Sequence, residues 1–457
     1  MKRFVRITDY SRKGHGVASL VEGSGRQGEI VGTVVGDEVE VAVGKRRRRG
    51  LSSCDLLRVV TPSPDRVSPR CIHAGICGGC SWQQVRYDAQ LKVKEDTVRR
   101  LFSPFIPAPR IHPIIPAVDR WEYRNKMEFS FSENRKGDRF LGLIMAQSRG
   151  KVLNITECHL VGGWYADVLD AVRDWWASRD LRAFRHASGT GTLRTLTLRE
   201  GTCRSKMVIL TVSGTHESFV DGKDLGTFTE AVLRVLPEAE TGIYLTIHQA
   251  KKGRPSRVYE MHVHGRNTLE EEITVRGKRL RLTVSPSSFF QPNRIQAERV
   301  YEKALSFIDP DPAMRLYDLY AGCGVAGMLF APFVKKVVGI ELSAYAVCDA
   351  RENMRRNGID NMVMIRGDVE EVLEEFRLPA DYIVVDPPRA GLSARALARL
   401  VRREPKKILY ISCNPATQTD NVSELARSGY LPTDVQPVDL FPHTPHVENL
   451  SLLVKRP

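Results

Sequence analysis

The stretch RLYDLYAGCGVAG, residues 315–327, decides the fold of the C-terminal part of the chain. It reads as a short buried strand followed by a G-x-G-x-x-G pattern (Gly322, Gly324, Gly327), which lets the backbone turn tightly and then open a helix. Strand and helix patterns alternate after it, in KKVVGIEL (335–342), AYAVCDARENMRRNG (344–358), MVMIRGDV (362–369), DYIVVDPP (381–388) and KKILYISC (406–413). This alternation predicts a Rossmann-like α/β domain over 285–457, doubly wound and mostly parallel, with its site at the C-terminal ends of the strands.

Two further domains are predicted before it, which makes the chain a multidomain protein. Residues 1–58 alternate apolar and polar positions in short runs between Gly-rich turns, and this predicts a small antiparallel, OB-like β-barrel. Residues 70–280 mix strand patterns with amphipathic helices, including one around 165–180, and this predicts a central α+β domain. The Pro/Ser-rich segment TPSPDRVSP (61–69) is expected to be a linker.

The charge balance favours a polyanionic partner. Among 457 residues, 68 are Lys or Arg and 54 are Asp or Glu, so the formal net charge is +14. Basic side chains displace condensed counterions from phosphates, so RNA or DNA is the expected partner. The tract KRRRR (45–49) falls beside a predicted strand and could grip a phosphate backbone; the alternative is a solvated turn. No apolar run reaches the ~20 residues that cross a membrane, and the N-terminus carries no secretory signal, so a cytoplasmic protein without a membrane partner is expected.

The nine cysteines, an odd number, argue against a disulfide framework and for metal or catalytic duties in some of them. Cys71, Cys77 and Cys80 crowd into CIHAGICGGC (71–80). Of the dispersed cysteines, Cys323 is a spacer within the glycine turn, and three are expected to be small core residues: Cys54, Cys203 and Cys348.

Two strand ends favour one cofactor over another. Glu341 lies 19 residues beyond Gly322, where a carboxylate can accept hydrogen bonds from ribose hydroxyls. This spacing fits both NAD and S-adenosylmethionine. The D-P-P tip that begins at Asp386 is common where methyltransferases hold a target base, and a hydride-transfer enzyme has no need of the thiol of Cys413. Together they favour S-adenosylmethionine.

Methylation of uracil at C5 gives Cys413 a task. Uracil C5 is a poor nucleophile until a thiolate adds to C6, and cysteine suits this addition because its thiolate attacks well and leaves again. Cys413 lies at a strand tip just before a helix, so we expect positive charge or the helix N-terminus to lower its pKa. A carboxylate must then remove the C5 proton, and Glu448, in HVEN (446–449), is the candidate. On chemistry alone, Asp386 could also accept a hydrogen bond from uracil N3.

Five motifs in the C-terminal part carry a family resemblance: FFQPN (289–293), DLYAGCG (318–324), DPPRAGL (386–392), SCNP (412–415) and HVEN (446–449). In this order they resemble the RNA uracil-5 methyltransferase family, which acts on 23S rRNA and on the tRNA T-loop. The resemblance implies that Cys413 attacks the uracil and Glu448 is the base. It also implies S-adenosylmethionine contacts from Gln291, Tyr320, Glu341 and Asp386. The N-terminal barrel resembles the RNA-binding TRAM domain of the same family.

The clustered cysteines point to one branch of that family. Cys71-x5-Cys77-x2-Cys80, together with Cys158 in ITECHL, resembles the ligand set of the members that modify 23S rRNA, where four thiolates hold a 4Fe-4S cluster. The tRNA-acting branch generally lacks this set. A zinc site is the alternative, with His73 or His159 replacing one thiolate. A structural role is expected for the cluster, because the methylation moves no net electrons.

The resulting prediction is a monomeric RNA (uracil-C5)-methyltransferase that acts on 23S rRNA, with tRNA as the alternative substrate. Two other classes fit fewer features. An NAD-dependent oxidoreductase would leave Cys413, Glu448 and the basic barrel without a task. A non-catalytic RNA-binding iron-sulfur protein would explain only the charge and the clustered cysteines.

Overall fold

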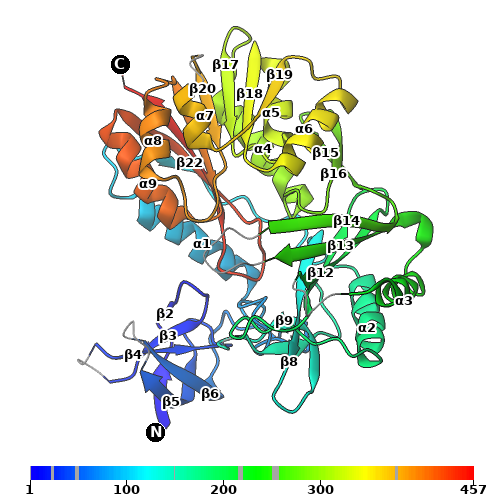
Figure 1. The fold of residues 1–457 in the computed structure, drawn as a ribbon. Coiled ribbons are helices and arrows are strands. Elements are labelled where there is room, and N and C mark those ends of the chain that lie inside the picture. Colours follow the sequence, from blue (N-terminus) through cyan, green and yellow to red (C-terminus); the bar gives the residue numbers. More distant parts are fainter. Residues whose placement is uncertain are drawn as a thin grey trace.

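The computed structural model describes residues 2–21, 25–46, 51–148, 150–214, 220–249, 257–375 and 379–456. Within these ranges the chain forms three large sheets and one hairpin (Figure 1). The basic tract at 45–49 lies at the end of a strand, and its residues 47–49 fall outside the described ranges.

The N-terminal sheet has its own small apolar core, which includes Ile7, Ile30 and Val41. Its strand order is β1-β5-β6-β4-β3-β2. The expected purely antiparallel pairing is wrong at one place, because β4 pairs parallel with β6. The strands are β1 (Lys2–Arg6), β2 (Asp9–Tyr10), β3 (Gly16–Ser19), β4 (Gln27–Ile30), β5 (Glu38–Arg46) and β6 (Leu51–Thr61).

The segment expected to be a linker folds back on this sheet. The Arg66 guanidinium pairs with the carboxylate of Asp37 at 2.5 Å, and the side chain of Asp37 is fully buried. The backbone N–H of Ser63 donates to the same carboxylate at 2.9 Å. Residues 61–69 are therefore anchored, because a buried carboxylate requires these partners.

The central sheet has the strand order β10-β9-β8-β11-β12-β13-β14 and is covered by two helices that pack on each other. Its alternating strands and the amphipathic helix lie where the sequence predicts them. The elements are β8 (Lys126–Glu133), β9 (Arg139–Ile144), β10 (Val152–Asn154), α2 (Trp164–Ala177), β11 (Leu193–Glu200), β12 (Lys206–Ser213), α3 (Gly222–Leu233), β13 (Thr241–Gln249) and β14 (Arg257–Gly265). A short 3₁₀ turn (Glu238–Glu240) precedes β13, and the hairpin of β15 (Leu269–Val275) and β16 (Lys278–Val284) leads to the C-terminal sheet.

The C-terminal sheet has the order β19-β18-β17-β20-β21-β23-β22-β7. The five strands from β19 to β21 run parallel, as expected, and β23 is antiparallel to both of its neighbours. The strands are β17 (Arg315–Leu319), β18 (Lys336–Glu341), β19 (Met362–Arg366), β20 (Tyr382–Val385), β21 (Lys407–Ser412), β22 (Tyr430–Val438), β23 (Glu448–Lys455) and β7 (Arg110–Ile111).

Helices cover both faces of this sheet, because its strands are apolar on both sides. In β17, Leu316 joins the core under one set of helices and Tyr317 joins the core under the other. The first set is α4 (Arg294–Ile308), α5 (Val325–Phe330) and α6 (Ala344–Arg356); the second is α7 (Val369–Glu375), α8 (Ala394–Val401), α9 (Pro415–Arg427) and α1 (Tyr87–Phe102). Within the described ranges, no helix is long and apolar enough to cross a bilayer.

The region expected as one central domain, 70–280, is divided between two sheets. Helix α1 packs on α9 and β22, and Val98 and Phe102 are buried in the C-terminal core (Figure 1). Strand β7 adds to the edge of the C-terminal sheet beside β22. Helix α1 and strand β7 thus belong to the C-terminal sheet, although they precede the central sheet in the sequence.

A buried ion pair fastens α1 to the C-terminal sheet. The Lys94 ammonium lies 2.6 Å from the carboxylate of Asp439, and neither side chain is exposed to solvent. The Tyr87 hydroxyl donates to the other oxygen of Asp439 at 2.8 Å. Burial lowers the pKa of Lys94, and the charge of Asp439 counteracts this effect.

We predict that Lys94→Met lowers the free energy of unfolding by about 3–5 kcal/mol, because it leaves the Asp439 carboxylate buried without its cation. Urea denaturation at pH 7 measures the change. Lys92→Met, at an exposed position on the same helix, is the matched control and should cost less than about 0.5 kcal/mol. Combining Lys94→Met with Asp439→Leu should recover much of the loss, and a double variant as unstable as the single one would contradict the argument.

Candidate active site

The glycine turn lies at the C-terminal end of β17 and opens α5. Gly322 and Gly324 have φ values of +55° and +83°, which side chains with a Cβ rarely adopt. A Cβ on Gly324 would also lie 3.1 Å from the Cβ of Ala350 in α6. The turn therefore needs glycine for its conformation and for the close packing of its helix.

Glu341, the last residue of β18, is held against this turn. Its carboxylate accepts hydrogen bonds from the backbone N–H of Gly322 at 3.0 Å and from that of Ser343 at 2.7 Å. The structure thus places the carboxylate predicted to bind ribose directly beside the glycine turn. A carboxylate has about four lone-pair positions, so it keeps acceptor capacity for hydroxyl groups.

A second carboxylate, which the sequence analysis did not single out, lies beneath the turn. Asp318 in β17 is buried, and its carboxylate accepts a hydrogen bond from the backbone N–H of Gly327 at 2.8 Å. Burial, together with the charges of Asp386 and Glu341, raises the pKa of Asp318 to about 7. The signal for it was present, since Asp318 opens the DLYAGCG motif.

We predict that Asp318→Asn stabilises the protein relative to wild type as the pH rises. A raised pKa means that the folded state holds a proton between about pH 4 and pH 7 that the unfolded state has released, so rising pH favours unfolding over this window. Asparagine keeps an acceptor for Gly327 and does not ionise. The gain over wild type should be small at pH 5 and on the order of 2–4 kcal/mol at pH 8, measured by urea denaturation. A gain equal at both pH values would show that ionisation of Asp318 is not its cause.

The strand register brings Cys413 and Glu448 together. Strands β21 and β23 pair antiparallel with Ser412 opposite Asn449, so the next positions, Cys413 and Glu448, face each other where the ladder ends. Opposed residues in such a ladder have Cα atoms roughly 4.5–5.5 Å apart. Glu448 is buried, with 3% of its surface exposed. A thiol and a buried carboxylate therefore meet at one end of the sheet.

Asp386 follows the neighbouring strand β20 and faces the same place. Its carboxylate accepts a hydrogen bond from the side-chain amide of Gln291 at 3.4 Å. Burial raises the pKa of Asp386 to about 7. Burial raises the pKa of Glu448 well above its usual range, and the charge of Asp386 adds to this shift. Two carboxylates so close together cannot both ionise easily.

The expected lowering of the Cys413 pKa is wrong. Burial raises the pKa of Cys413 to about 11; the charges of Glu448 and Asp386 raise it too, whereas Arg389 lowers it. Helix α9 does begin two residues after Cys413, as the sequence suggested. The buried carboxylates and the desolvation of the thiol outweigh the positive charge, so the protein at rest holds Cys413 as a thiol.

Arg389, another residue that the sequence analysis passed over, links the loops around Cys413. Its backbone carbonyl accepts hydrogen bonds from the Asn414 side-chain amide at 3.0 Å and from the Thr417 hydroxyl at 3.2 Å. Its guanidinium lies 3.4 Å from Nδ1 of His446. The DPPRAGL, SCNP and HVEN motifs are therefore joined in space, which their distance along the chain does not reveal.

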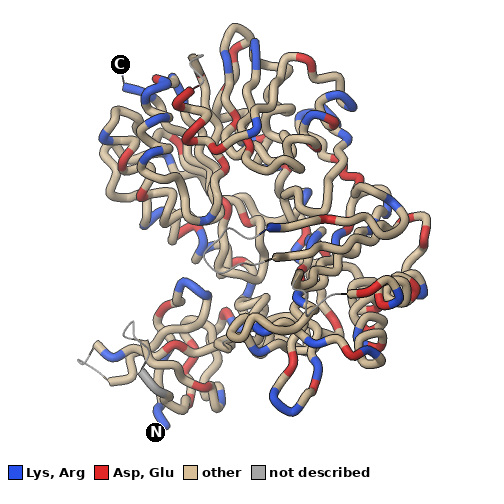
Figure 2. Tube along the Cα trace, in the orientation of Figure 1, with Lys and Arg blue, Asp and Glu red and all other residues tan. Residues whose placement is uncertain are grey.

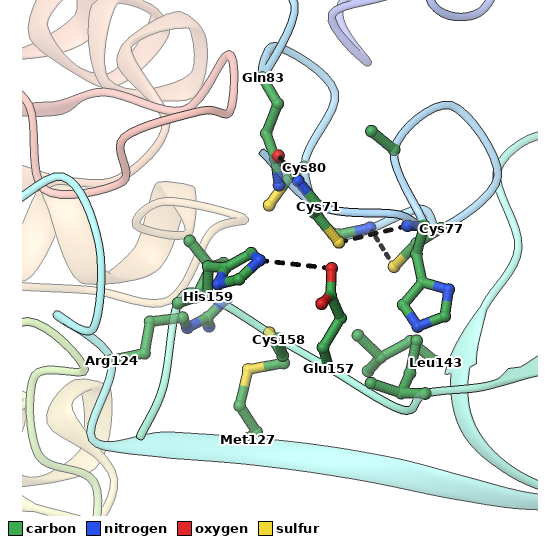
Figure 3. A pocket seen from close by; sticks show the side chains of 15 residues that line it. Cys71, Cys77, Cys80, Gln83, Arg124, Met127, Leu143, Glu157, Cys158 and His159 are labelled. Carbon is green, nitrogen blue, oxygen red and sulfur yellow. Dashed lines mark hydrogen bonds and ion pairs between the residues drawn. The ribbon is translucent and has the colours of Figure 1, made fainter. Parts of the chain in front are cut away.

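A second site collects the four predicted cluster cysteines. Cys71, Cys77, Cys80 and Cys158 line one pocket, together with His73, His159 and apolar side chains (Figure 3). Burial raises the pKa of all four thiols, that of Cys80 to about 12. The carboxylate of Glu157 lies among them, 3.3 Å from Nε2 of His159, and accepts a hydrogen bond from the backbone N–H of Ile72.

The donor atoms of this pocket are mainly thiols, with imidazole nitrogens beside them. Four thiols on apolar walls are the donor set of an iron-sulfur cluster. No group of three or more His, Cys, Asp or Glu side chains in the described part of the chain is arranged to hold one metal ion. To admit a cluster, the Glu157 side chain has to turn out of the pocket.

The remaining cysteines fit the expectation only in part. Cys54 is buried, as predicted, and Cys323, the spacer of the glycine turn, is buried as well. Cys203 and Cys348 are exposed, so their assignment to the core is wrong. Cys203 lies in a turn with φ +59°, and Cys348 lies on the outer side of α6. Cysteine is so often buried that its identity alone gave no warning of these positions.

Basic and acidic residues are interspersed over the described part of the fold (Figure 2). Figure 2 shows Lys and Arg on every part of the fold, with Asp and Glu interspersed among them. The N-terminal sheet itself carries ion pairs, such as that of Arg58 with Glu40 at 2.8 Å. The net charge of +14 is thus distributed over the whole molecule.

A Rossmann-like domain with a glycine turn, a carboxylate held against that turn and a cysteine facing a buried glutamate defines a methyltransferase that acts on a nucleic-acid base. Comparisons with known proteins agree. The family described as tRNA (Uracil-5-)-methyltransferase matches residues 252–456. An uncharacterized RNA methyltransferase of Protochlamydia amoebophila is 41% identical over 93% of this chain and 99% of its own, and one of Caldanaerobacter subterraneus is 32% identical over 99% and 98%. The chain belongs to the RNA (uracil-5-)-methyltransferase family and is an RNA uracil-C5 methyltransferase.

The fold is shared with a solved structure over its whole length. The tRNA (uracil-54, C5)-methyltransferase of Pyrococcus abyssi, solved in complex with S-adenosyl-L-homocysteine, superposes with a TM-score of 0.74. It is 24% identical, and the match covers 99% of both chains. At this identity the likeness concerns the fold, including the Rossmann-like methyltransferase domain.

Proposed function

We propose that the chain methylates C5 of a uridine in 23S rRNA, with Cys413 as the nucleophile and Glu448 as the base. The single observation that carries this proposal is the β21–β23 register, which sets Cys413 opposite a buried Glu448 at the C-terminal end of the sheet. The reaction needs a nucleophile to add at C6 and a general base to remove the proton at C5. Both groups must therefore reach the same uracil ring.

The reaction begins at the thiol. Cys413 gives its proton to water, and its sulfur forms a bond to C6 of the uracil while the C5–C6 π electrons move toward C5 and O4. The enolate carbon C5 then takes the methyl group. Glu448, in its ionised form, removes the C5 proton, the electrons of that C–H bond restore the C5–C6 double bond, and the C–S bond breaks to release the thiolate. Arg389 stabilises the thiolate at both ends of this sequence, because its charge lowers the pKa of Cys413.

The residues around the glycine turn fit the methyl donor. When bound, S-adenosylmethionine supplies an electrophilic methyl group and a positive charge. The Glu341 carboxylate, fixed by the turn, accepts from ribose hydroxyls, and Tyr320 lies at the start of the same turn, with φ +61°. Gln291 and Asp386, joined at 3.4 Å, lie between the turn and Cys413, so they can contact the donor or, for Asp386, the N3–H of the uracil.

The cysteine pocket supports 23S rRNA as the substrate. Cys71, Cys77, Cys80 and Cys158 would hold a 4Fe-4S cluster, the feature of the family branch that the sequence resembles. The cluster would supply a structural tie between the 71–80 loop and the central sheet. The N-terminal sheet would bind RNA as a TRAM domain does. Because the proposed substrate is ribosomal RNA, the reaction would take place in the cytoplasm.

The test is methyl transfer from labelled S-adenosylmethionine to unmodified 23S rRNA and tRNA transcripts, with nuclease mapping of the label. Label as 5-methyluridine in 23S rRNA supports the whole proposal. Label confined to tRNA supports the proposed reaction but contradicts 23S rRNA as the substrate. Iron and acid-labile sulfide, measured on anaerobically purified protein, should approach four of each per chain.

A further inference from the structure

The loop that leads into Glu448 is held by side chains from distant parts of the chain. We call residues 439–447, between β22 and β23, the base loop. Besides the buried pair at Asp439, the Lys94 ammonium donates to the carbonyl of Phe441 at 3.0 Å. The side chain of Asn293 donates to the carbonyl of Leu440 at 3.1 Å.

His443, in the middle of the base loop, has a strained backbone and is held on several sides. Its φ of +65° lies in the left-handed region, which is unfavourable for a residue with a Cβ. Its ring stacks on the ring of Trp121, with centroids 4.0 Å apart and planes inclined by 24°. Its carbonyl accepts from the backbone N–H of Trp82 at 3.0 Å, and its own N–H donates to Gln90 at 2.9 Å. Such a conformation persists only where the surroundings enforce it.

The same two tryptophans border the cysteine pocket. Trp121 meets the ring of His159, which lines the pocket, edge to face at 6.0 Å. Trp82 follows Cys80 by two residues, and its backbone N–H is the donor to the carbonyl of His443. Gln83, beside Trp82, accepts a hydrogen bond from the backbone N–H of Cys71 at 3.2 Å. The cysteine pocket and the base loop therefore share Trp82 and Trp121 as neighbours.

We propose that Trp121 and Trp82 are positioning residues that couple the cysteine site to the base loop, so that an ordered cysteine site keeps Glu448 in place for proton removal. This inference rests on the proposed role of Glu448. The cysteine site would then support the elimination step, through the position of Glu448, rather than electron transfer.

Hydrogen exchange of the base-loop amides tests the coupling without any chemistry. In Trp121→Leu, peptides covering 439–447 should exchange about threefold to tenfold faster than in wild type, because one stacked aromatic pair is lost. Trp121→Phe keeps a ring for His443 and should exchange like wild type. Cys80→Ser, which breaks the cysteine site itself, should accelerate the same peptides. Unchanged exchange in either Trp121→Leu or Cys80→Ser overturns the proposal.

Turnover with the RNA substrate tests the consequence. Trp121→Leu should lower kcat by about threefold to tenfold, leave KM for RNA within about twofold, and increase the fraction of enzyme trapped as covalent protein–RNA adduct. A raised KM with unchanged kcat overturns the positioning role, as does a loss of iron from Trp121→Leu. If wild type itself transfers no methyl group, the proposed function fails, and the exchange experiment still decides whether the coupling exists.

Discussion

Cys413→Ala is expected to lower kcat for methyl transfer by on the order of 10⁴-fold or more, with RNA binding retained. Without the sulfur, nothing adds to C6, and C5 stays too poor a nucleophile to take a methyl group. Electrostatics and positioning by the remaining site cannot replace a bond that the reaction requires. The measurement is the rate of 5-methyluridine formation at saturating RNA and methyl donor.

The matched control is Cys348→Ala, which removes an exposed thiol from α6 and should leave kcat unchanged. A second assay uses RNA with 5-fluorouridine at the target, since fluorine at C5 cannot be removed as a proton. Wild type should form a covalent adduct with this RNA that survives a denaturing gel, and Cys413→Ala should form none. An adduct with Cys413→Ala would assign the nucleophile to another residue.

The C-terminal domain could be predicted because its signals are local. Each parallel strand is a short apolar run, each is followed by a helix pattern, and the glycine turn marks where the first strand ends. The parallel pairing of β4 with β6 was missed, since the direction of pairing depends on how the whole sheet closes. Helix α1 was assigned to the wrong sheet for a similar reason. Its amphipathic pattern shows that one face is buried but does not identify the sheet against which that face packs.

The site shows the same division. The sequence motifs singled out Cys413, Glu448 and Asp386. The structure brings all three residues to one end of the sheet. Their mutual electrostatics were not predictable, because the pKa of Cys413 depends on a glutamate 35 positions further along that only the β21–β23 register brings near. Lys94 and Asp439 lie 345 positions apart, and no local pattern connects them. Sequence thus named the candidate reacting groups, while tertiary structure sets their protonation.

Glu448→Gln is expected to convert the enzyme into a trap for its own substrate. Addition of Cys413 and methyl transfer need no base at C5, so both proceed, whereas elimination stalls because an amide does not take up the C5 proton. We expect kcat to fall about 10²–10⁴-fold and the covalent protein–RNA adduct to accumulate toward one per enzyme, seen as a shifted band on a denaturing gel. The adduct should carry the labelled methyl group.

Misfolding would not account for this result. The raised pKa of Glu448 means that ionising it inside the fold is costly, so a neutral glutamine should leave stability unchanged or higher above about pH 5. Glu404→Gln, which removes an exposed carboxylate paired with Lys455 at 2.9 Å, is the matched control and should turn over like wild type without adduct. Full turnover by Glu448→Gln would exclude Glu448 as the base. An adduct without the methyl label would instead show that Glu448 acts before methyl transfer, because the covalent enolate would then accumulate unmethylated.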